Sequence, residues 1–197
     1  MATGLRKAKR NRVRRALFEA AIALFQDHGF EAVSVEEIAE RAGYSRATFF
    51  NHFQTKEGVL RHYGEHLREQ VEAGLLLLGA ETGPLERIRS VLQTMMTEAE
   101  LHREEARIVY LYSSGDPSHL ANPTLALELL TTFVREAQEA GLARRDLPAE
   151  ETGFLVAGML QVATLAVVLG GRTAESMVDV TWQFILGGVR GEGKMAP

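Results

Sequence analysis

The residues that most clearly indicate a chemical role lie between Ser34 and Phe53. Arginine, threonine and asparagine side chains can form hydrogen bonds with base edges in the major groove of DNA. This segment carries all three types, at Arg46, Thr48 and Asn51. Because direct contacts to bases require these side chains to project together from one rigid element, the surrounding helices decide whether this chemistry is available.

Two short helices are expected around these residues. Ser34 followed three residues later by Glu37 is the signature of a capping box, and Gly43 indicates where that helix ends. Ser45 then caps a second helix that runs through His52. Two short helices separated by a glycine turn are typical of a helix-turn-helix, in which the second helix enters the major groove.

The helical period separates an inward apolar face from an outward polar face in this motif. The inward positions on the two helices are Ile38, Ala39, Ala42, Phe49 and Phe53. Phe49 and Phe53 are therefore expected in the core rather than on DNA. On the outward face, Arg46 is best suited to guanine, and a contact to phosphate is the alternative. Ser34 and Ser45 have a second interpretation, because capping alone would explain a serine at either position.

The 197-residue chain has a net charge of −4, but this charge is unevenly distributed. Residues 1–15 contain seven basic residues and no acidic one, and residues 1–52 carry a net charge of +3 against −7 for residues 53–197. A basic N-terminal segment on an acidic body is suited to meet phosphate at that end only. A solvated, disordered basic tail is the alternative that charge alone leaves open.

Composition limits the class of protein further. Hydrophobic residues make up 46% of the chain, which is enough for a sizeable core. The absence of cysteine excludes disulfides, thiolate metal sites and a cysteine nucleophile, and it fits a reducing compartment. The basic N-terminal residues are not followed by an apolar run, so no secretory signal is expected and a cytoplasmic location is predicted.

Helical periodicity, together with capping, Gly and Pro signals, predicts an all-α fold of about nine helices. The expected ranges are 5–28, 35–42, 46–52, 55–78, 84 onward, 104–112, 123–140, 148–169 and 174–186. A loop is expected after residue 113, a cap at Asn122 and a glycine-rich tail at the C-terminus. Gly58 and Gly64 are expected weak points of the fourth helix. We expect a three-helix helix-turn-helix domain over residues 1–53 and a C-terminal helical bundle over residues 54–197.

The expected eighth helix is apolar on all sides between Phe154 and Leu169, apart from Gln161 and Thr164. These 16 residues are fewer than the roughly 20 that a membrane span needs, so no membrane contact is expected. A second copy of the chain is expected to cover the eighth and ninth helices in a four-helix dimer interface. The stripe expected on the ninth helix is Met177, Val180, Phe184 and Ile185. A central core helix of a monomer is the alternative for the eighth.

The segment from about residue 14 to residue 60 resembles the N-terminal domain of the tetracycline-repressor (TetR) family. The matching residues are Ala20, Ala21, Leu24, Phe25, Gly29, Phe30, Ile38, Ala39, Ala42, Gly43, Tyr44, Ser45, Thr48, Phe50, His52, Phe53, Lys56 and Glu57. The resemblance implies a homodimeric transcription regulator, usually a repressor, that binds a palindromic DNA operator. It also implies that a small molecule bound in the C-terminal body releases the DNA. No cofactor is expected.

The expected DNA contacts follow from the motif and from this resemblance. They are Ser34, Tyr44, Ser45, Arg46, Thr48, Phe50, Asn51, His52 and Lys56. The resemblance implies phosphate contacts for Ser34 and Lys56, and a backbone contact for His52, for which an ordinary surface histidine is the alternative. Phe50 stands where the family usually has tyrosine, so a hydroxyl contact to phosphate is missing. The basic residues 6–15 could add phosphate or minor-groove contacts.

The effector site implied by the resemblance should lie in the C-terminal body. The candidate lining residues are Met95, Met96, Tyr110, Tyr112, Phe133, Met159 and Trp182, and the candidates for orienting a ligand are Gln161 and Thr164. Ordinary core packing is the alternative for the apolar candidates. A hydrogen bond within the core or across the dimer is the alternative for the two polar candidates.

Other classes of protein fit the sequence less well. A metal sensor would use His62 and His66, four residues apart beside Glu65, but no third ligand lies at a usable spacing. An enzyme would need a nucleophile elbow, a phosphate loop or a spaced catalytic pair, and the sequence contains no such motif. A small-molecule binder without a DNA role would leave the basic N-terminus and the motif unexplained. We therefore expect neither a metal site nor catalysis.

Overall fold

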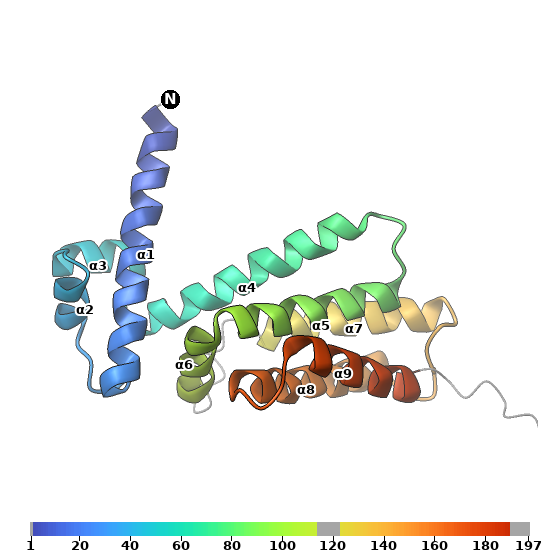
Figure 1. Cartoon of the computed structure of the whole chain (residues 1–197). Coiled ribbons are helices and arrows are strands. Elements are labelled where there is room, and N and C mark those ends of the chain that lie inside the picture. The colour runs from blue at the N-terminus through green and yellow to red at the C-terminus, as the bar shows by residue number, and fades with distance from the viewer. Residues whose placement is uncertain (1, 114–122, 190–197) are drawn as a thin grey trace, which may run out of the picture. The chain divides into compact units, whose positions relative to one another are not determined.

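Figure 1 shows the computed structural model of the chain, which describes residues 2–113 and 123–189. Within these ranges every regular element is an α-helix, so the predicted all-α fold is confirmed. The helices are α1 (Ala2–His28), α2 (Val35–Arg41), α3 (Arg46–Phe53), α4 (Glu57–Leu78), α5 (Pro84–Leu101), α6 (Arg103–Ser113), α7 (Pro123–Glu139), α8 (Ala149–Val168) and α9 (Ala174–Val189). The loop expected after residue 113, the cap expected at Asn122 and the tail from residue 190 lie outside the described residues.

The chain divides into two compact units. The first contains the residues through Tyr63 and the part of α6 from Arg107 onward, and the second contains Gly64–Ala106 and the chain from α7 to α9. The first unit extends beyond the end of the motif because Val59 and Leu60, at the start of α4, are buried in its core. Helix α4 therefore belongs to the first unit at its start and to the second unit over the rest of its length.

The first unit has its own apolar core. Its largest buried side chains come from α1, α2, α3 and α4, and they include Leu17, Phe25, Ile38, Phe49 and Leu60. Ile108 of α6 joins the same core. Helix α1 begins at Ala2, three residues before the expected start, and it contains all of the basic residues between positions 6 and 15. The alternative interpretation of these residues as a disordered basic tail, which charge alone left open, is therefore wrong.

Gly43 sets the turn between α2 and α3. Its φ of +75° lies in the left-handed region that favours glycine. The Gly43 N–H donates to the Glu40 oxygen at 3.0 Å, and the Tyr44 N–H donates to the Ala39 oxygen at 2.8 Å. These two bonds form a Schellman motif, which satisfies carbonyl groups at the end of α2 and lets α3 begin directly after Ser45.

The second unit is a helical bundle in which α5, α7, α8 and α9 pack around one apolar core (Figure 1). Its fully buried residues include Ile88, Leu92, Met96, Leu130, Val134 and Val167. Helix α4 adds Val71 to this core. Gly153 allows α8 to approach α7 closely, since a Cβ at this position would lie 2.7 Å from Thr131 Cα.

Helix α8 is long and apolar enough to cross a membrane, judged by length and composition alone. The prediction that the apolar run is too short counted only the 16 residues from Phe154, whereas the whole helix begins at Ala149, close to its expected start, and has 20 residues. Core helices of soluble proteins have the same properties, and one face of α8 is buried in the second unit through Val156, Leu160 and Val167. The opposite face exposes Phe154, Leu155, Val162 and Leu169.

Helix α9 packs beside α8 and extends to Val189, three residues further than expected (Figure 1). Ile185 is buried in the core of the second unit, so its predicted place on an outward stripe was wrong. Val180 and Phe184 are exposed. The two neighbouring helices α8 and α9 therefore both carry uncovered apolar side chains within the part of the chain that the structure describes.

Candidate nucleic-acid interface

Helix α2 begins with the capping box that the sequence predicts. Ser34 Oγ accepts a hydrogen bond from the Glu37 N–H at 3.2 Å. The Glu37 carboxylate accepts hydrogen bonds from the Ser34 hydroxyl at 2.7 Å and from the Ser34 N–H at 2.8 Å. These bonds from Ser34 hold the pKa of Glu37 below its usual value. The exposed Ser34 hydroxyl therefore already has a structural role at the position where a phosphate contact is expected.

Helix α3 is held in place by two buried phenylalanine rings on its inner side and by a capping serine at its start. Phe49 and Phe53 are buried in the core of the first unit, as predicted. Ser45 Oγ accepts a hydrogen bond from the Thr48 N–H at 3.2 Å, and the hydroxyl oxygens of Ser45 and Thr48 lie 2.9 Å apart. The half-buried Thr48 hydroxyl is therefore tied to the helix cap.

Arg46 and Asn51 are exposed on α3. Arg46 Nε lies 2.9 Å from a carboxylate oxygen of Glu36 on α2, and the Arg46 guanidinium lies 5.3 Å from the centroid of the partly exposed Phe50 ring. Both partners of the ion pair are more than half exposed, at 64% and 54%. The ion pair with Glu36 therefore contributes only about 1 kcal/mol or less, so Arg46 can leave Glu36 for a base or a phosphate at a small loss of free energy.

His52, near the end of α3, lies in the positive field of α1. The pKa of His52 is lowered, first by burial and then by the charges of Arg10 and Arg14. The Arg14 guanidinium lies 5.4 Å from the centroid of the Phe53 ring. Arg10 and Arg14 were expected only as part of a general basic arm. Their spacing of one helical turn is the signal that could have singled them out, once residues 6–15 are known to be helical.

Tyr44 and Lys56 have contacts within the first unit. Tyr44 is half-buried against its core. Lys56 Nζ donates to the backbone oxygens of Phe30, Glu31 and Val33 at 2.6, 3.3 and 3.1 Å. A lysine ammonium has three donors, so these carbonyl groups use all of them. The structure therefore gives Lys56 the role of joining the start of α4 to the connection between α1 and α2.

The apolar effector candidates fall into two groups. Those in the core of the second unit or packed against it are Met95, Met96, Phe133, Met159 and Trp182. Tyr110 and Tyr112 lie on the part of α6 that belongs to the first unit. There the Tyr112 ring packs against Phe30, with 5.1 Å between the ring centroids. The second unit therefore gathers five of the seven apolar candidates, while the two tyrosines lie elsewhere.

The two polar candidates on α8 differ in exposure. Gln161 is exposed. Thr164 Oγ1 is buried and has no hydrogen-bond partner among the described residues. A buried hydroxyl without a partner is costly unless something satisfies it. Thr164 is therefore the stronger of the two candidates for an interaction with a bound molecule.

The two histidines considered for a metal site have different surroundings. The His62 ring packs against Phe18 and Phe53 in the first unit, with centroid distances of 5.2 and 5.8 Å. His66 lies in the second unit, where its Nε2 is 2.7 Å from Glu98 Oε2. The structure therefore does not pair His62 with His66, and it gives His66 a carboxylate neighbour that the spacing of residues did not reveal.

The first unit matches a known family. The family profile described as "Bacterial regulatory proteins, tetR family" matches residues 17–63. This range contains the helix-turn-helix and all nine residues expected to contact DNA. The matched range ends at Tyr63, which is also the last residue of α4 that belongs to the first unit. The resemblance seen in the sequence is therefore confirmed.

Curated relatives and a solved structure agree with this match. The transcriptional regulator TcmR of Streptomyces glaucescens is 33% identical over 93 residues, which cover 47% of this chain and 41% of TcmR. The transcriptional activator FasR of Mycolicibacterium smegmatis is 26% identical over 194 residues, covering 91% of this chain and 84% of FasR. Several curated relatives are, like TcmR, matched over less than half of their own length.

The solved structure is that of FadR from Thermus thermophilus, a TetR-family transcriptional repressor in complex with lauroyl-CoA. It matches with a TM-score of 0.63 and 27% sequence identity, over 93% of this chain and 98% of FadR. The match therefore extends beyond the helix-turn-helix to the C-terminal body. The relatives include an activator as well as a repressor.

Proposed function

Because the chain belongs to the TetR family of bacterial regulatory proteins, we propose that it is a ligand-responsive transcriptional repressor. A homodimer binds a palindromic operator in double-stranded DNA through α3 of each subunit, and a small-molecule effector releases the dimer. The proposal assigns the chain a cytoplasmic location, no catalytic activity and no membrane partner.

The division of α3 into a buried side and an exposed side is the main support for DNA binding. Phe49 and Phe53 hold one side of the helix in the core, while Arg46 and Asn51 are exposed. A recognition helix needs this division, because its outer side chains must reach base edges while its inner side stays packed. The guanidinium of Arg46 matches the two acceptors of guanine, and the amide of Asn51 matches adenine.

Further DNA contacts complete the proposed interface. We assign Tyr44, Ser45 and Thr48 to the major groove or its edge. We assign Ser34, Phe50 and His52 to the DNA backbone, and Phe50 acts through its ring alone. Arg10 and Arg14 supply positive charge beside His52, which attracts phosphate. Lys56 has a supporting role instead, because its donors are used within the first unit.

The outer faces of α8 and α9 support the homodimer. Leu155, Val162 and Leu169 recur every seven residues, a spacing that lines one face of a helix for packing against another helix. Val180 and Phe184 on α9 are also exposed. Contiguous exposed apolar residues mark interfaces. A central core helix of a monomer would not leave this face of α8 exposed.

The second unit is the proposed effector site. Thr164 has a buried hydroxyl that a ligand can satisfy. FadR of Thermus thermophilus holds lauroyl-CoA, so acyl-CoA thioesters are the first ligand class we assign to this chain. Helix α4 continues from the second unit into the DNA-reading unit. A ligand that binds better to one position of α4 therefore shifts the population toward it and alters DNA affinity.

Selection from random double-stranded DNA, followed by fluorescence anisotropy, tests the DNA-binding part of the proposal. The wild-type protein should bind the selected duplex at least about 10³-fold more tightly than a scrambled duplex, and this affinity should fall steeply with salt. Arg46→Ala should weaken binding to the selected duplex by about 10-fold or more, with little change on the scrambled duplex. Equal binding of both duplexes by the wild type overturns the proposal.

The matched control is Arg89→Ala, which removes a half-exposed arginine that is paired with Asp179 in the second unit. It should leave both affinities unchanged. Lauroyl-CoA added to the preformed DNA complex tests the effector. Release of the duplex supports the assigned ligand class, and retention across saturated acyl-CoAs of varied chain length overturns it.

A further inference from the structure

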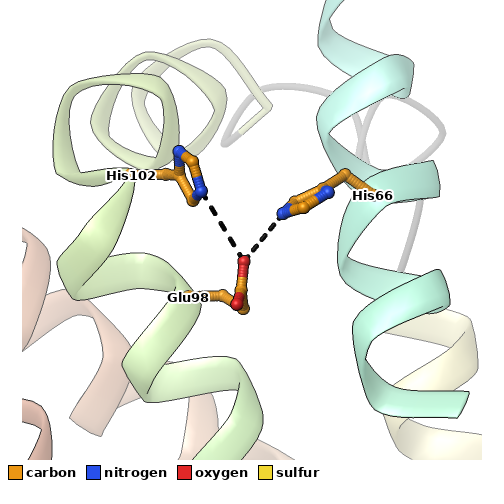
Figure 2. A group of neighbouring side chains, drawn as sticks. All are labelled: His66, Glu98 and His102. Atoms are coloured by element: carbon orange, nitrogen blue, oxygen red, sulfur yellow. Dashed lines mark hydrogen bonds and ion pairs between the residues drawn. The ribbon is translucent and has the colours of Figure 1, made fainter. Parts of the chain in front are cut away.

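Three metal-binding side chains converge where α4 passes the corner between α5 and α6 (Figure 2). His66 lies on α4, Glu98 on the last turn of α5, and His102 between α5 and α6. His66 Nε2 lies 2.7 Å from Glu98 Oε2, and His102 Nε2 lies 3.8 Å from the same oxygen. One ligand atom of each residue lies within 4.8 Å of the other two. All three residues belong to the second unit.

The chemistry of this cluster suits Zn²⁺. Two imidazole nitrogens and one carboxylate oxygen are a set that binds Zn²⁺ while leaving a fourth position open. Bond lengths of about 2.0–2.2 Å place the ligand atoms of a tetrahedral site about 3.3–3.6 Å apart. The two distances to Glu98 Oε2, 2.7 and 3.8 Å, lie on either side of this range. Small rotations of the His66 and His102 side chains therefore bring all three atoms around one ion.

The surroundings favour a metal over a simple ion pair. The Glu98 side chain is only 15% exposed, so its charge needs a positive partner. One imidazolium would be enough, yet Figure 2 shows two imidazole rings pointing at the same carboxylate, with 5.2 Å between the ring centroids. A simple ion pair needs only one of these rings, whereas a divalent ion uses one nitrogen of each ring as a ligand.

Glu105 gives His102 a further partner. A Glu105 carboxylate oxygen lies 3.8 Å from His102 Nδ1, whereas the other ring nitrogen, Nε2, is the one near Glu98. A carboxylate at the second ring nitrogen is the usual means of orienting a metal-ligating histidine. Glu105 is therefore placed to act as a positioning residue for His102.

We propose that His66, Glu98 and His102 form a Zn²⁺ site whose fourth position is filled by water or by a group of a bound ligand. The site goes beyond the proposed DNA-binding function and does not depend on it. An ion held by these residues links the middle of α4 to the end of α5. Since the ion binds only the folded arrangement, Zn²⁺ should stabilise the protein against unfolding.

Calorimetric titration of the tag-free, EDTA-treated full chain with ZnCl₂ tests the proposal. We expect one ion per chain and a higher melting temperature in Zn²⁺ than in EDTA. His66→Gln and His102→Gln should each weaken binding by at least about 100-fold, and Glu105→Gln by about 10- to 100-fold. Glu98→Gln is a second test, because it keeps the shape of the side chain and removes its charge.

The matched control is His28→Gln, which removes an exposed histidine at the end of α1 and should bind Zn²⁺ like the wild type. Far-UV circular dichroism in EDTA checks that each variant is folded. The proposal is overturned if the wild type takes up no equivalent of Zn²⁺, or if folded His66→Gln, His102→Gln and Glu98→Gln all bind as the wild type does. A loss in His28→Gln equal to that in His66→Gln overturns it as well.

Discussion

The ammonium of Lys56 lies 2.6 Å from the backbone oxygen of Phe30 and 4.4 Å from the centroid of the Phe30 ring. Two further bonds, to the oxygens of Glu31 and Val33, bring the same ammonium to the segment between α1 and α2. These carbonyl groups lie outside any helix and have one charged donor in common. Lys56 therefore stabilises the frame that carries α2 and α3.

Lys56→Met should destabilise the protein by about 1–3 kcal/mol, because partly buried carbonyl oxygens lose their charged donor. Urea unfolding of the full chain, followed by circular dichroism, measures this loss. Lys9→Met, on the exposed part of α1, is the matched control and should change stability by less than about 0.5 kcal/mol. If Lys56→Met keeps wild-type stability and weakens binding to all DNA sequences equally, Lys56 is instead the phosphate contact that the family resemblance implies.

Gly58 is required by a close approach at the junction of α3 and α4. A Cβ at this position would lie 2.0 Å from the Phe53 backbone oxygen and 3.1 Å from its carbonyl carbon. Gly58→Ala should therefore destabilise the protein by about 1–3 kcal/mol or more, which thermal unfolding measures. Gly4→Ala, where no atom lies within 4 Å, is the control and should not lower the melting temperature. A Gly58→Ala protein with wild-type stability and a lost effector response would contradict this prediction and indicate that the glycine eases movement of α4 instead.

Ser34 and Glu37 make a contribution to stability that depends on pH. The folded protein lowers the pKa of Glu37, so this contribution is present above the pKa of Glu37 in the unfolded chain and is lost as the pH falls through the folded pKa. Ser34→Ala should raise the pKa of Glu37 and reduce the loss of stability in acid. It should also cost about 0.5–2 kcal/mol at neutral pH, because the cap is removed.

Urea unfolding across the acid range checks the prediction for Ser34. The matched control is Ser45→Ala, since Ser45 caps α3 through Thr48 and not through an acidic residue. It should lower stability by a similar amount without changing the dependence on pH. An unaltered acid dependence in Ser34→Ala would contradict the prediction.

His52 reports on the charge of α1. Arg10→Gln should raise the pKa of His52, because one of two nearby positive charges is removed while burial, the larger cause, is kept. An NMR titration of the His52 imidazole measures the change. Since the folded pKa lies below the usual value, protonation of His52 weakens the fold as the pH falls below that value, and Arg10→Gln should lessen this loss. Arg12→Gln, two residues along α1, is the control and should leave the pKa unchanged.

The starts of α2 and α3, the end of α2 and the recognition motif could be predicted from the sequence because they depend on local signals. Ser34 and Ser45 start helices through bonds to the third residue ahead, and Gly43 ends a helix through its own backbone angle. The inward position of Phe49 and Phe53 follows from the helical period. Each of these features is decided within a few residues of chain, which is the range that a sequence pattern reports.

Contacts between distant segments could not be predicted in this way. Lys56 reaches carbonyl groups 23 to 26 residues earlier, and His66 reaches Glu98 across 32 residues. No spacing rule connects such pairs, because their meeting depends on how whole helices pack. The same limit explains why Ile185 was placed on an outer stripe of α9, since the period of a helix gives its faces but not which face the core takes.

Phe184 tests the dimer that the outer faces of α8 and α9 support. Its side chain is 72% exposed, and burying a phenylalanine contributes about 1.5–3 kcal/mol, whereas an unpaired carboxylate at the same place opposes burial. Phe184→Glu should therefore convert the dimer to a monomer in sedimentation experiments. Leu77→Glu, on the exposed end of α4, is the control and should sediment as the wild type does.

The monomeric variant should also lose its preference for the palindromic duplex while keeping weak binding to any duplex, because one recognition helix can occupy only one half-site. If Phe184→Glu remains a dimer, the dimer interface does not lie on this face of α8 and α9.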